Sequence, residues 1–146
     1  MAERLFLDSN IIMYAIGGSH PLRRPCAAVI ERIQARRLSV VTNTEIVQEI
    51  LYRYRALGKA ALALEVGALL MAIADEVFGV LPEDMRLAME LIRRHPAVNT
   101  RDAIHCATMV RTRTRTIISA DRHFDQFPAL RRLDPKDFAE TTRASV

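Results

Sequence analysis

Short runs of consecutive apolar residues alternate with amphipathic stretches along most of this 146-residue chain. The first run, "LFL" at residues 5–7, places apolar side chains on both faces of the predicted strand. A strand with one exposed face would alternate apolar and polar residues, so strands of this kind are expected to be buried on both faces. Such burial is typical of a parallel sheet covered by helices, and the sequence therefore predicts an α/β domain.

The order of these elements predicts a small, mostly parallel sheet of four to five strands. Apolar residues recur at helical spacing between the runs, Pro82 suits the first turn of a helix, and Gly58 suits the end of one. Strands are expected at residues 4–8, 38–42, 76–81 and 115–120, with a fifth at an edge over 130–135 that Pro135 stops. A helical turn is expected at 9–15, helices at 25–37, 43–57, 60–74, 82–95 and 99–112, and a loop with Gly and Pro at 17–25.

Composition favours one folded domain. Half of the residues are hydrophobic and 26% are charged, which suits a chain with a substantial core. We find no internal repeat or flexible linker, and expect a single domain over 1–146 with its core at about 4–135 and a short tail at 136–146. No apolar run approaches the roughly 18–20 residues of a membrane span, and the N-terminus carries no secretory signal. We therefore expect a cytoplasmic protein without membrane contact, whose Cys26 and Cys106 are reduced and face the core.

The charge balance mildly favours a polyanionic partner. The net charge is +4, and all of the 21 basic residues except Lys59 and Lys136 are arginine. Arginine binds phosphate in a bidentate manner, and a basic protein gains affinity for nucleic acid by releasing counterions. A bias in codon usage explains the arginine excess equally well, so the composition alone does not choose between these two explanations.

Three aspartates are predicted to converge at one edge of the sheet. Asp8 ends the first strand and Asp121 follows the fourth, and the carboxyl ends of parallel strands lie at the same edge. Asp102 opens the helix at 99–112, which precedes the fourth strand. In a right-handed crossover this helix runs antiparallel to the strands, so Asp102 is expected at that edge as well.

Clustered carboxylates repel one another, and a cation between them removes the conflict. Mg²⁺ and Mn²⁺ prefer carboxylate oxygens, and the chain has no His/Cys cluster typical of zinc. His105, three residues after Asp102, is expected to be structural rather than a ligand. The alternative is that each aspartate only caps a helix, with Asp102 in a capping box that begins at Asn99. It is the joint convergence that favours a metal site.

Glu49 is not distinguished by the residues around it. It lies at the flank of the apolar stripe of the helix at 43–57, and Arg53 follows at i+4. An ordinary surface ion pair explains this spacing. The local pattern therefore does not choose Glu49 over Glu45 as a further acid of the site.

Four motifs, in this order and at this spacing, resemble the PIN-domain nucleases, and specifically the VapC toxins of bacterial type II toxin–antitoxin pairs. They are "FLDSNIIMYA", "TNTEIVQEILYRY", "TRDAIHCATMV" and "TIISADRHFDQFP", and the resemblance covers about residues 4–135. It implies a three-layer α/β/α PIN-like fold and a Mg²⁺-dependent (or Mn²⁺-dependent) ribonuclease site with four acids. Carried over by motif, the catalytic and metal-binding acids are Asp8, Glu49, Asp102 and Asp121.

The resemblance also suggests auxiliary residues around these acids. Asn10, together with Thr44 or Thr42, is expected to form hydrogen bonds within the site, and Asp125 to be a peripheral helper. Arg101 and Arg122 adjoin two of the acids and are expected to bind the RNA backbone. Three further arginines alternate with threonine in "RTRTRT", where a solvated helix end is the alternative: Arg111, Arg113 and Arg115.

The expected function is hydrolysis of RNA phosphodiester bonds by a metal-dependent endoribonuclease that acts as a toxin. The family implies a homodimer and a cognate antitoxin, and the apolar helix at 60–74 is either a surface for such a partner or a core helix. The alternative function is a catalytically weak PIN-fold binding module that acts through an antitoxin–DNA complex. A phosphotransfer domain is disfavoured because the segment from Asp8 to Asn10 lacks the paired D-x-D acids of haloacid dehalogenase-like phosphatases.

Overall fold

The computed structural model describes residues 3–137, in which five strands form one sheet. The strand order is β3-β2-β1-β4-β5, and every neighbouring pair is parallel. The predicted sheet is therefore confirmed, including its short fifth strand at an edge. The strands are β1 (Leu5–Leu7), β2 (Val40–Asn43), β3 (Glu76–Phe78), β4 (Thr116–Ile118) and β5 (Arg131–Leu133).

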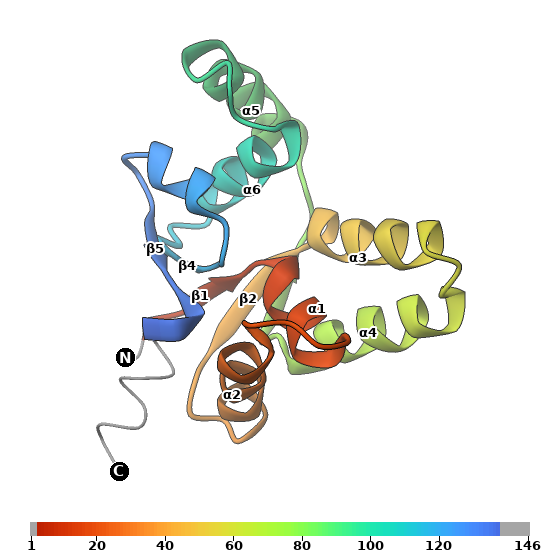
Figure 1. Ribbon diagram of the computed structural model, residues 1–146. Coiled ribbons are helices and arrows are strands. Elements are labelled where there is room, and N and C mark those ends of the chain that lie inside the picture. The colour runs from red at the N-terminus through yellow and green to blue at the C-terminus, as the bar shows by residue number, and fades with distance from the viewer. Residues whose placement is uncertain (1–2, 138–146) are drawn as a thin grey trace.

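The helices pack in pairs on the two faces of this sheet. In Figure 1, α1 and α2 lie on one side of the strands, and α5 and α6 lie on the other. The pair α3–α4 packs together and extends outward from the sheet (Figure 1). The helices are α1 (Ser9–Ile16), α2 (Arg23–Gln34), α3 (Thr44–Ala56), α4 (Ala60–Ile73), α5 (Pro82–Arg94) and α6 (Thr100–Arg111), followed by the 3₁₀ helix η1 (Arg122–Gln126).

Burial explains why the central strands lack polar alternation. Every residue of β1 is buried, and Phe6 and Leu7 have no exposed surface. The edge strands β3 and β5 instead begin with the exposed residues Glu76 and Arg131. Charged residues at sheet edges discourage pairing with other chains. The core therefore lies around β1, β2 and β4, and the free thiols of Cys26 and Cys106 are buried as predicted.

The direction of chain progression reverses next to β1. The chain moves from β1 to β2 and β3 on one side, and then crosses back to β4 and β5 on the other. Ligands of open parallel sheets bind at such a switch point, beyond the carboxyl ends of the strands. The segments that follow β1 and β4 are therefore the expected location of a functional site.

Several boundaries differ from the sequence prediction, and the helix predicted at 25–37 spans Arg23–Gln34. The loop predicted at 17–25 is too long, because α2 begins at Arg23 and includes Pro25 in its first turn. Proline is tolerated there because N–H groups in the first turn have no partner within the helix. The strands are also shorter than predicted, and residues 138–146 of the predicted tail lie outside the described residues. No helix within residues 3–137 combines the length and apolar content that crossing a bilayer requires.

The helix predicted at 60–74 has both a core face and an exposed apolar face. Gly58, with φ of +73°, ends α3 and lets the chain turn back into α4. The buried face of α4 includes Gly67, where an added Cβ would lie only 3.4 Å from Leu51 Cδ2. On the outer face, Leu64 is 67% exposed and Met71 is 54% exposed. The core explanation therefore holds for the buried face, and a partner surface stays a prediction for the exposed face.

Candidate metal centre

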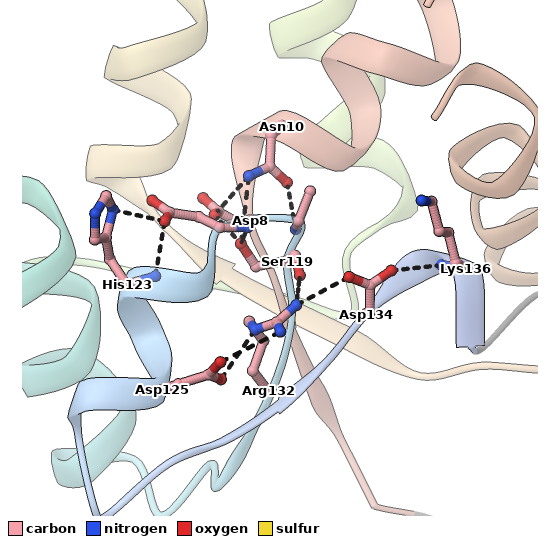
Figure 2. A network of polar contacts seen from close by, with 10 residues as sticks. Asp8, Asn10, Ser119, His123, Asp125, Arg132, Asp134 and Lys136 are labelled. Carbon is pink, nitrogen blue, oxygen red and sulfur yellow. Dashed lines mark hydrogen bonds and ion pairs between the residues drawn. The ribbon is translucent and has the colours of Figure 1, made fainter. Parts of the chain in front are cut away.

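Asp8 is held rigidly where β1 ends and α1 begins. Its carboxylate caps α1 by accepting a hydrogen bond from Ser9 N at 2.8 Å. Oδ2 also accepts hydrogen bonds from Ser119 Oγ at 2.6 Å and from Asn10 Nδ2 at 3.2 Å (Figure 2). Burial, together with the nearby Glu49 carboxylate, raises the pKa of Asp8 to about 6, although the Ser119 hydrogen bond opposes this rise. Asp8 therefore caps α1 and also lies close to other acids of the predicted site.

Glu49 faces the same buried region from α3. Only 7% of the residue is exposed, and Oε2 accepts a hydrogen bond from the Ser9 hydroxyl. Arg101 Nη1 lies 3.9 Å from Oε1, so the cation near Glu49 is Arg101 and not Arg53. Ser9 thus holds Glu49 through its hydroxyl while its backbone N–H holds Asp8.

Asp102 enters the region from the first turn of α6. Asn99 caps the helix by accepting a hydrogen bond from Asp102 N at 2.9 Å, but the Asp102 carboxylate does not return a hydrogen bond to Asn99 N. Instead, Oδ2 is buried and has no hydrogen-bond partner among residues 3–137. Burial, followed by the charges of Asp121 and Asp8, raises the pKa of Asp102. A buried carboxylate oxygen without a donor is costly unless a cation or water meets it.

Asp121 completes the group from the start of η1. It caps this turn by accepting a hydrogen bond from His123 N at 2.9 Å, and His123 Nδ1 lies 2.8 Å from Oδ1. Oxygens of Asp102 and Asp121 lie within 4.8 Å of each other and of a His123 ring nitrogen. A second triplet with the same spacing contains Asp8, Glu49 and His105. The four predicted acids therefore meet at the switch-point edge, as two adjoining pairs.

The hydrogen bonds of Asn43 determine the tautomer of His105. Asn43 Oδ1 accepts from Ile46 N at 2.9 Å, which identifies the other amide atom as the nitrogen donor. This nitrogen lies 3.0 Å from Thr108 Oγ1 and 3.2 Å from His105 Nδ1. Since Asn43 Nδ2 can only donate, His105 Nδ1 accepts and the ring proton is on Nε2.

This tautomer makes His105 a poor metal ligand. The ring is fully buried, and burial, with a smaller contribution from Arg101, lowers its pKa to about 3. The imidazole is therefore neutral, with Nδ1 occupied by Asn43 and Nε2 protonated. The donors left to a cation in this buried part are carboxylate oxygens, a set that suits Mg²⁺ or Mn²⁺ better than zinc.

The auxiliary residues divide into two groups. Asn10 lies in the site, where it contacts Asp8 and Ser119 and accepts from Ala120 N at 3.3 Å. The prediction for the threonines is wrong, because Thr44 accepts from Val80 N and Thr42 donates to Leu7 O. Both hydroxyls therefore connect strand ends and loops, and neither contacts an acid of the site.

Asp125 is also directed away from the four acids. It pairs with Arg132, whose Nε lies 3.0 Å from Oδ1, and is thus no helper of the predicted kind. Arg132 Nη1 also donates to Ser119 O and to Asp134, both at 3.1 Å (Figure 2). Arg132 therefore connects β5 and η1 to the residue that holds Asp8.

The arginines predicted to bind RNA lie at different places. Arg101 is beside Glu49, and Arg122 is exposed at the start of η1. Arg111 instead forms an ion pair with Asp84 at 2.6 Å, nine residues after Asp102 on the same helix. At 1.5 Å per residue this is about 13 Å along the axis. The "RTRTRT" run therefore begins at the opposite end of α6 from the acids. This position agrees with the alternative of a solvated helix end.

Sequence reasoning missed the residues that hold the acids in place. Ser9 and Ser119 were visible in "LDSN" and "ISAD" as hydroxyls directly beside the acids. Asn43 was visible as a helix cap, but nothing in the sequence connected it to His105. The role of Arg132 could not be predicted from the sequence, because its partners depend on how β5 pairs with β4.

Comparisons with known proteins identify the family of this chain. Residues 5–130 match the family described as PIN domain. The chain is 31% identical over 129 residues to ribonuclease VapC13 of Mycobacterium tuberculosis, and the match covers 88% of this chain and 98% of that protein.

Solved structures of low sequence identity share the fold. VapC20 of M. tuberculosis, a sarcin–ricin loop cleaving toxin, gives a TM-score of 0.70 at 16% identity over 84% of this chain and 93% of that one. VapBC2 of Rickettsia felis, bound to a DNA fragment from its promoter, gives 0.68 at 16% identity over 90% and 98%. The family match, the similarity to VapC13 and the shared fold lead to one assignment: the chain belongs to the PIN-domain family and, within it, to the VapC ribonucleases.

Proposed function

We propose that this chain is a divalent-metal-dependent endoribonuclease that acts as the toxin of a toxin–antitoxin pair. The observation that carries the proposal is the meeting of four carboxylates at the switch-point edge, with Asp102 Oδ2 buried and unpartnered among the described residues. Similarity to ribonuclease VapC13 supports RNA as the substrate. An RNA substrate also supports the cytoplasm as the place of action.

The residues present fit a hard cation. Asp8, Asp102, Asp121 and Glu49 would hold Mg²⁺ or Mn²⁺ through carboxylate oxygens. When bound, the ion supplies a Lewis acid that lowers the pKa of water and polarises the phosphate.

The chain itself orients the reactants. Ser9, Ser119 and Asn10 hold the Glu49 and Asp8 oxygens at fixed positions, so little reorganisation is needed when charge develops. Arg101, beside Glu49, is placed to contact a phosphate oxygen of the RNA. We propose that water attacks the phosphorus directly and gives a proton to one of the carboxylates. The P–O bond to the leaving oxygen of the RNA breaks, that oxygen takes a proton from solvent, and no covalent enzyme intermediate forms.

A cleavage assay tests this proposal. The purified chain is incubated with a tRNA and rRNA mixture and Mg²⁺ or Mn²⁺, with an EDTA control. Asp8→Asn and Asp102→Asn should each lower cleavage at least about 100-fold, because each removes a direct ligand. Glu65→Gln, which removes an exposed acid of α4, serves as the matched control and should cleave normally. Undiminished cleavage by both aspartate variants would refute the assignment.

We further propose that the chain forms a homodimer and binds a cognate antitoxin. The exposed side chains of Leu64 and Met71 on α4 support a protein partner, because exposed apolar surface is usually covered. The structure of VapBC2, which shares the fold of this chain, supports an antitoxin as the partner. Light scattering of the chain alone should give twice the monomer mass. Leu64→Glu should weaken capture by an antitoxin encoded next to this gene.

The second candidate is a catalytically weak binding module that acts through an antitoxin–DNA complex. The promoter DNA bound to VapBC2 favours this alternative. It predicts no cleavage with either metal, together with a stable complex between this chain and its antitoxin on promoter DNA. Cleavage that EDTA abolishes would exclude it.

A further inference from the structure

Tyr52 is an exposed aromatic residue beside the acid cluster. It lies on α3 three residues after Glu49, on the same side of the helix, and is 58% exposed. Among residues 3–137 it is the only Phe or Tyr that is exposed. Tyr54 is buried, and the ring of Tyr14 stacks on His20 at 4.0 Å between centroids. An aromatic-poor chain thus places an open ring next to its candidate metal centre.

Arg101 connects this ring to the acids. Its guanidinium carbon lies 5.5 Å from the Tyr52 ring centroid, and Nη1 lies 3.9 Å from Glu49 Oε1. Arg101 immediately precedes Asp102 on α6, so the contact spans two helices that each contribute an acid. A guanidinium stacked on a ring keeps its N–H edges available for a phosphate.

This pairing of a ring with a cation suits single-stranded nucleic acid. Unpaired bases stack on aromatic rings and guanidinium planes, whereas bases within a duplex are already stacked on their neighbours. The Arg101 cation lies over one side of the Tyr52 ring, and the exposure of Tyr52 leaves ring surface open to solvent. A base stacked here would place its phosphate near Glu49 and Arg101.

We propose that Tyr52 and Arg101 form a platform that binds one unpaired nucleobase adjacent to the scissile phosphate. This inference rests on the proposed nuclease function and deepens it, because it names the side chains that would hold a base next to the bond that is cleaved. Tyr52 acts as a binding residue that selects unpaired substrate and takes no part in the bond-breaking step. A protein side chain from a partner is the competing occupant of the ring.

The absence of tryptophan from the sequence allows a direct test. Tyr52→Trp keeps a stacking surface and introduces the only tryptophan of the chain. Placed in the Asp102→Asn background to prevent cleavage, its fluorescence should be quenched by a single-stranded heptanucleotide RNA. A duplex of the same sequence, and the same strand with abasic sites, should quench it far less. Tyr14→Trp in the same background is the control, and its fluorescence should not respond to RNA.

Measurements of RNA affinity and of cleavage kinetics provide the second test. Tyr52→Leu should weaken single-stranded RNA binding about tenfold and raise KM more than it lowers kcat, as expected for lost base stacking. Tyr52→Phe should restore both values. Equal quenching by duplex and abasic RNA, or unchanged RNA affinity in Tyr52→Leu, would overturn the platform. Quenching without any cleavage by the unmodified chain would instead refute only the nuclease proposal.

Discussion

Ser119 Oγ lies 2.6 Å from Asp8 Oδ2, although 111 residues separate the two in the sequence. The hydroxyl donates to the carboxylate and lowers the pKa of Asp8, against the rise that burial causes. This hydrogen bond therefore favours the ionised form that a cation requires. It connects the end of β1 to the segment that follows β4.

Ser119→Ala should weaken metal binding most at mildly acidic pH. The loss of the hydrogen bond raises the pKa of Asp8, so binding should fail at a higher pH than in the unmodified chain. The expected loss of Mn²⁺ affinity is roughly 10-fold or more, as for other residues that orient ligands. Isothermal titration between pH 5.5 and 8 measures it. Ser39→Ala removes a serine that pairs with Asp75 away from the site and should leave the profile unchanged.

The metal-free protein should lose stability as the pH rises from about 4 to above 6. The pKa of Asp8 is 3.8 in its unperturbed form and about 6 in the folded chain, so folding favours its protonated form. The stabilisation is complete below the lower value and is lost as the pH passes the higher one, at a cost of at most about 3 kcal/mol. Burial also raises the pKa of Asp102, which acts in the same direction.

Urea unfolding in EDTA at pH 5 and pH 8 measures this loss. Added Mg²⁺ should recover stability at pH 8 and have little effect at pH 5, where Asp8 is largely protonated. Asp8→Asn should flatten the dependence on pH. A metal-free chain that is more stable at pH 8 than at pH 5 would show that the burial of ionised acids does not control its stability.

Asn43→Asp should give the site a histidine ligand. A carboxylate at this position accepts where the amide nitrogen donates, so the His105 ring proton should move to Nδ1 and leave a lone pair on Nε2. The helix should persist, because Asp is as good a cap as Asn. We expect a gain in Zn²⁺ affinity relative to Mg²⁺. Nitrogen-15 spectra of the ring should show the exchange of tautomers.

Thr108→Val provides the comparison for this variant. It removes the other hydrogen bond from the Asn43 amide and leaves the contact with His105 intact. In this variant the His105 tautomer and the metal preference of the site should match those of the unmodified chain. A ring that is already protonated on Nδ1 in the unmodified chain would contradict the role assigned to Asn43.

Arg132→Met should destabilise the fold, because the largely buried arginine bonds to two carboxylates and a backbone carbonyl. The Arg132 side chain is 11% exposed and bonds to Asp125, Asp134 and Ser119 O. Water can replace the donor at the half-exposed Asp125, so the cost comes mainly from Asp134 and Ser119 O and should be about 1–3 kcal/mol in the free energy of unfolding. Arg131→Met, at the exposed neighbouring position, should stay within about 0.5 kcal/mol. Chemical denaturation compares the two variants.

The sequence predicted the elements and their convergence because both depend on local patterns and on the handedness of crossovers. Consecutive apolar residues indicated β1, and the positions of Asp8 and Asp121 after strands placed them at one edge. The choice of Glu49 over Glu45 required the family resemblance. The structure supports that choice physically, since Glu49 is buried against Ser9 whereas Glu45 is only partly buried.

The supporting hydrogen bonds could not be predicted because they depend on side-chain direction across the sheet. The resemblance predicts Thr44 in the site, yet its hydroxyl accepts a hydrogen bond from Val80 N in the loop after β3. Asp125 was assigned from its spacing to Asp121, but the five-residue 3₁₀ turn directs it toward Arg132 instead. A difference of one rotamer or one turn changes such contacts, and neither is encoded in residue spacing.

The pairing of β1 with β4 has a consequence for protein synthesis. Phe6 pairs with Ile117 and Leu7 with Ile118, so the central strand remains without one neighbour until most of the chain has been made. Contacts of such large sequence separation form late and slow the folding of a domain. Asp121 emerges from the ribosome later still. A chain released prematurely, before residue 116, would lack both β4 and Asp121, so we expect incomplete copies to be unfolded and inactive.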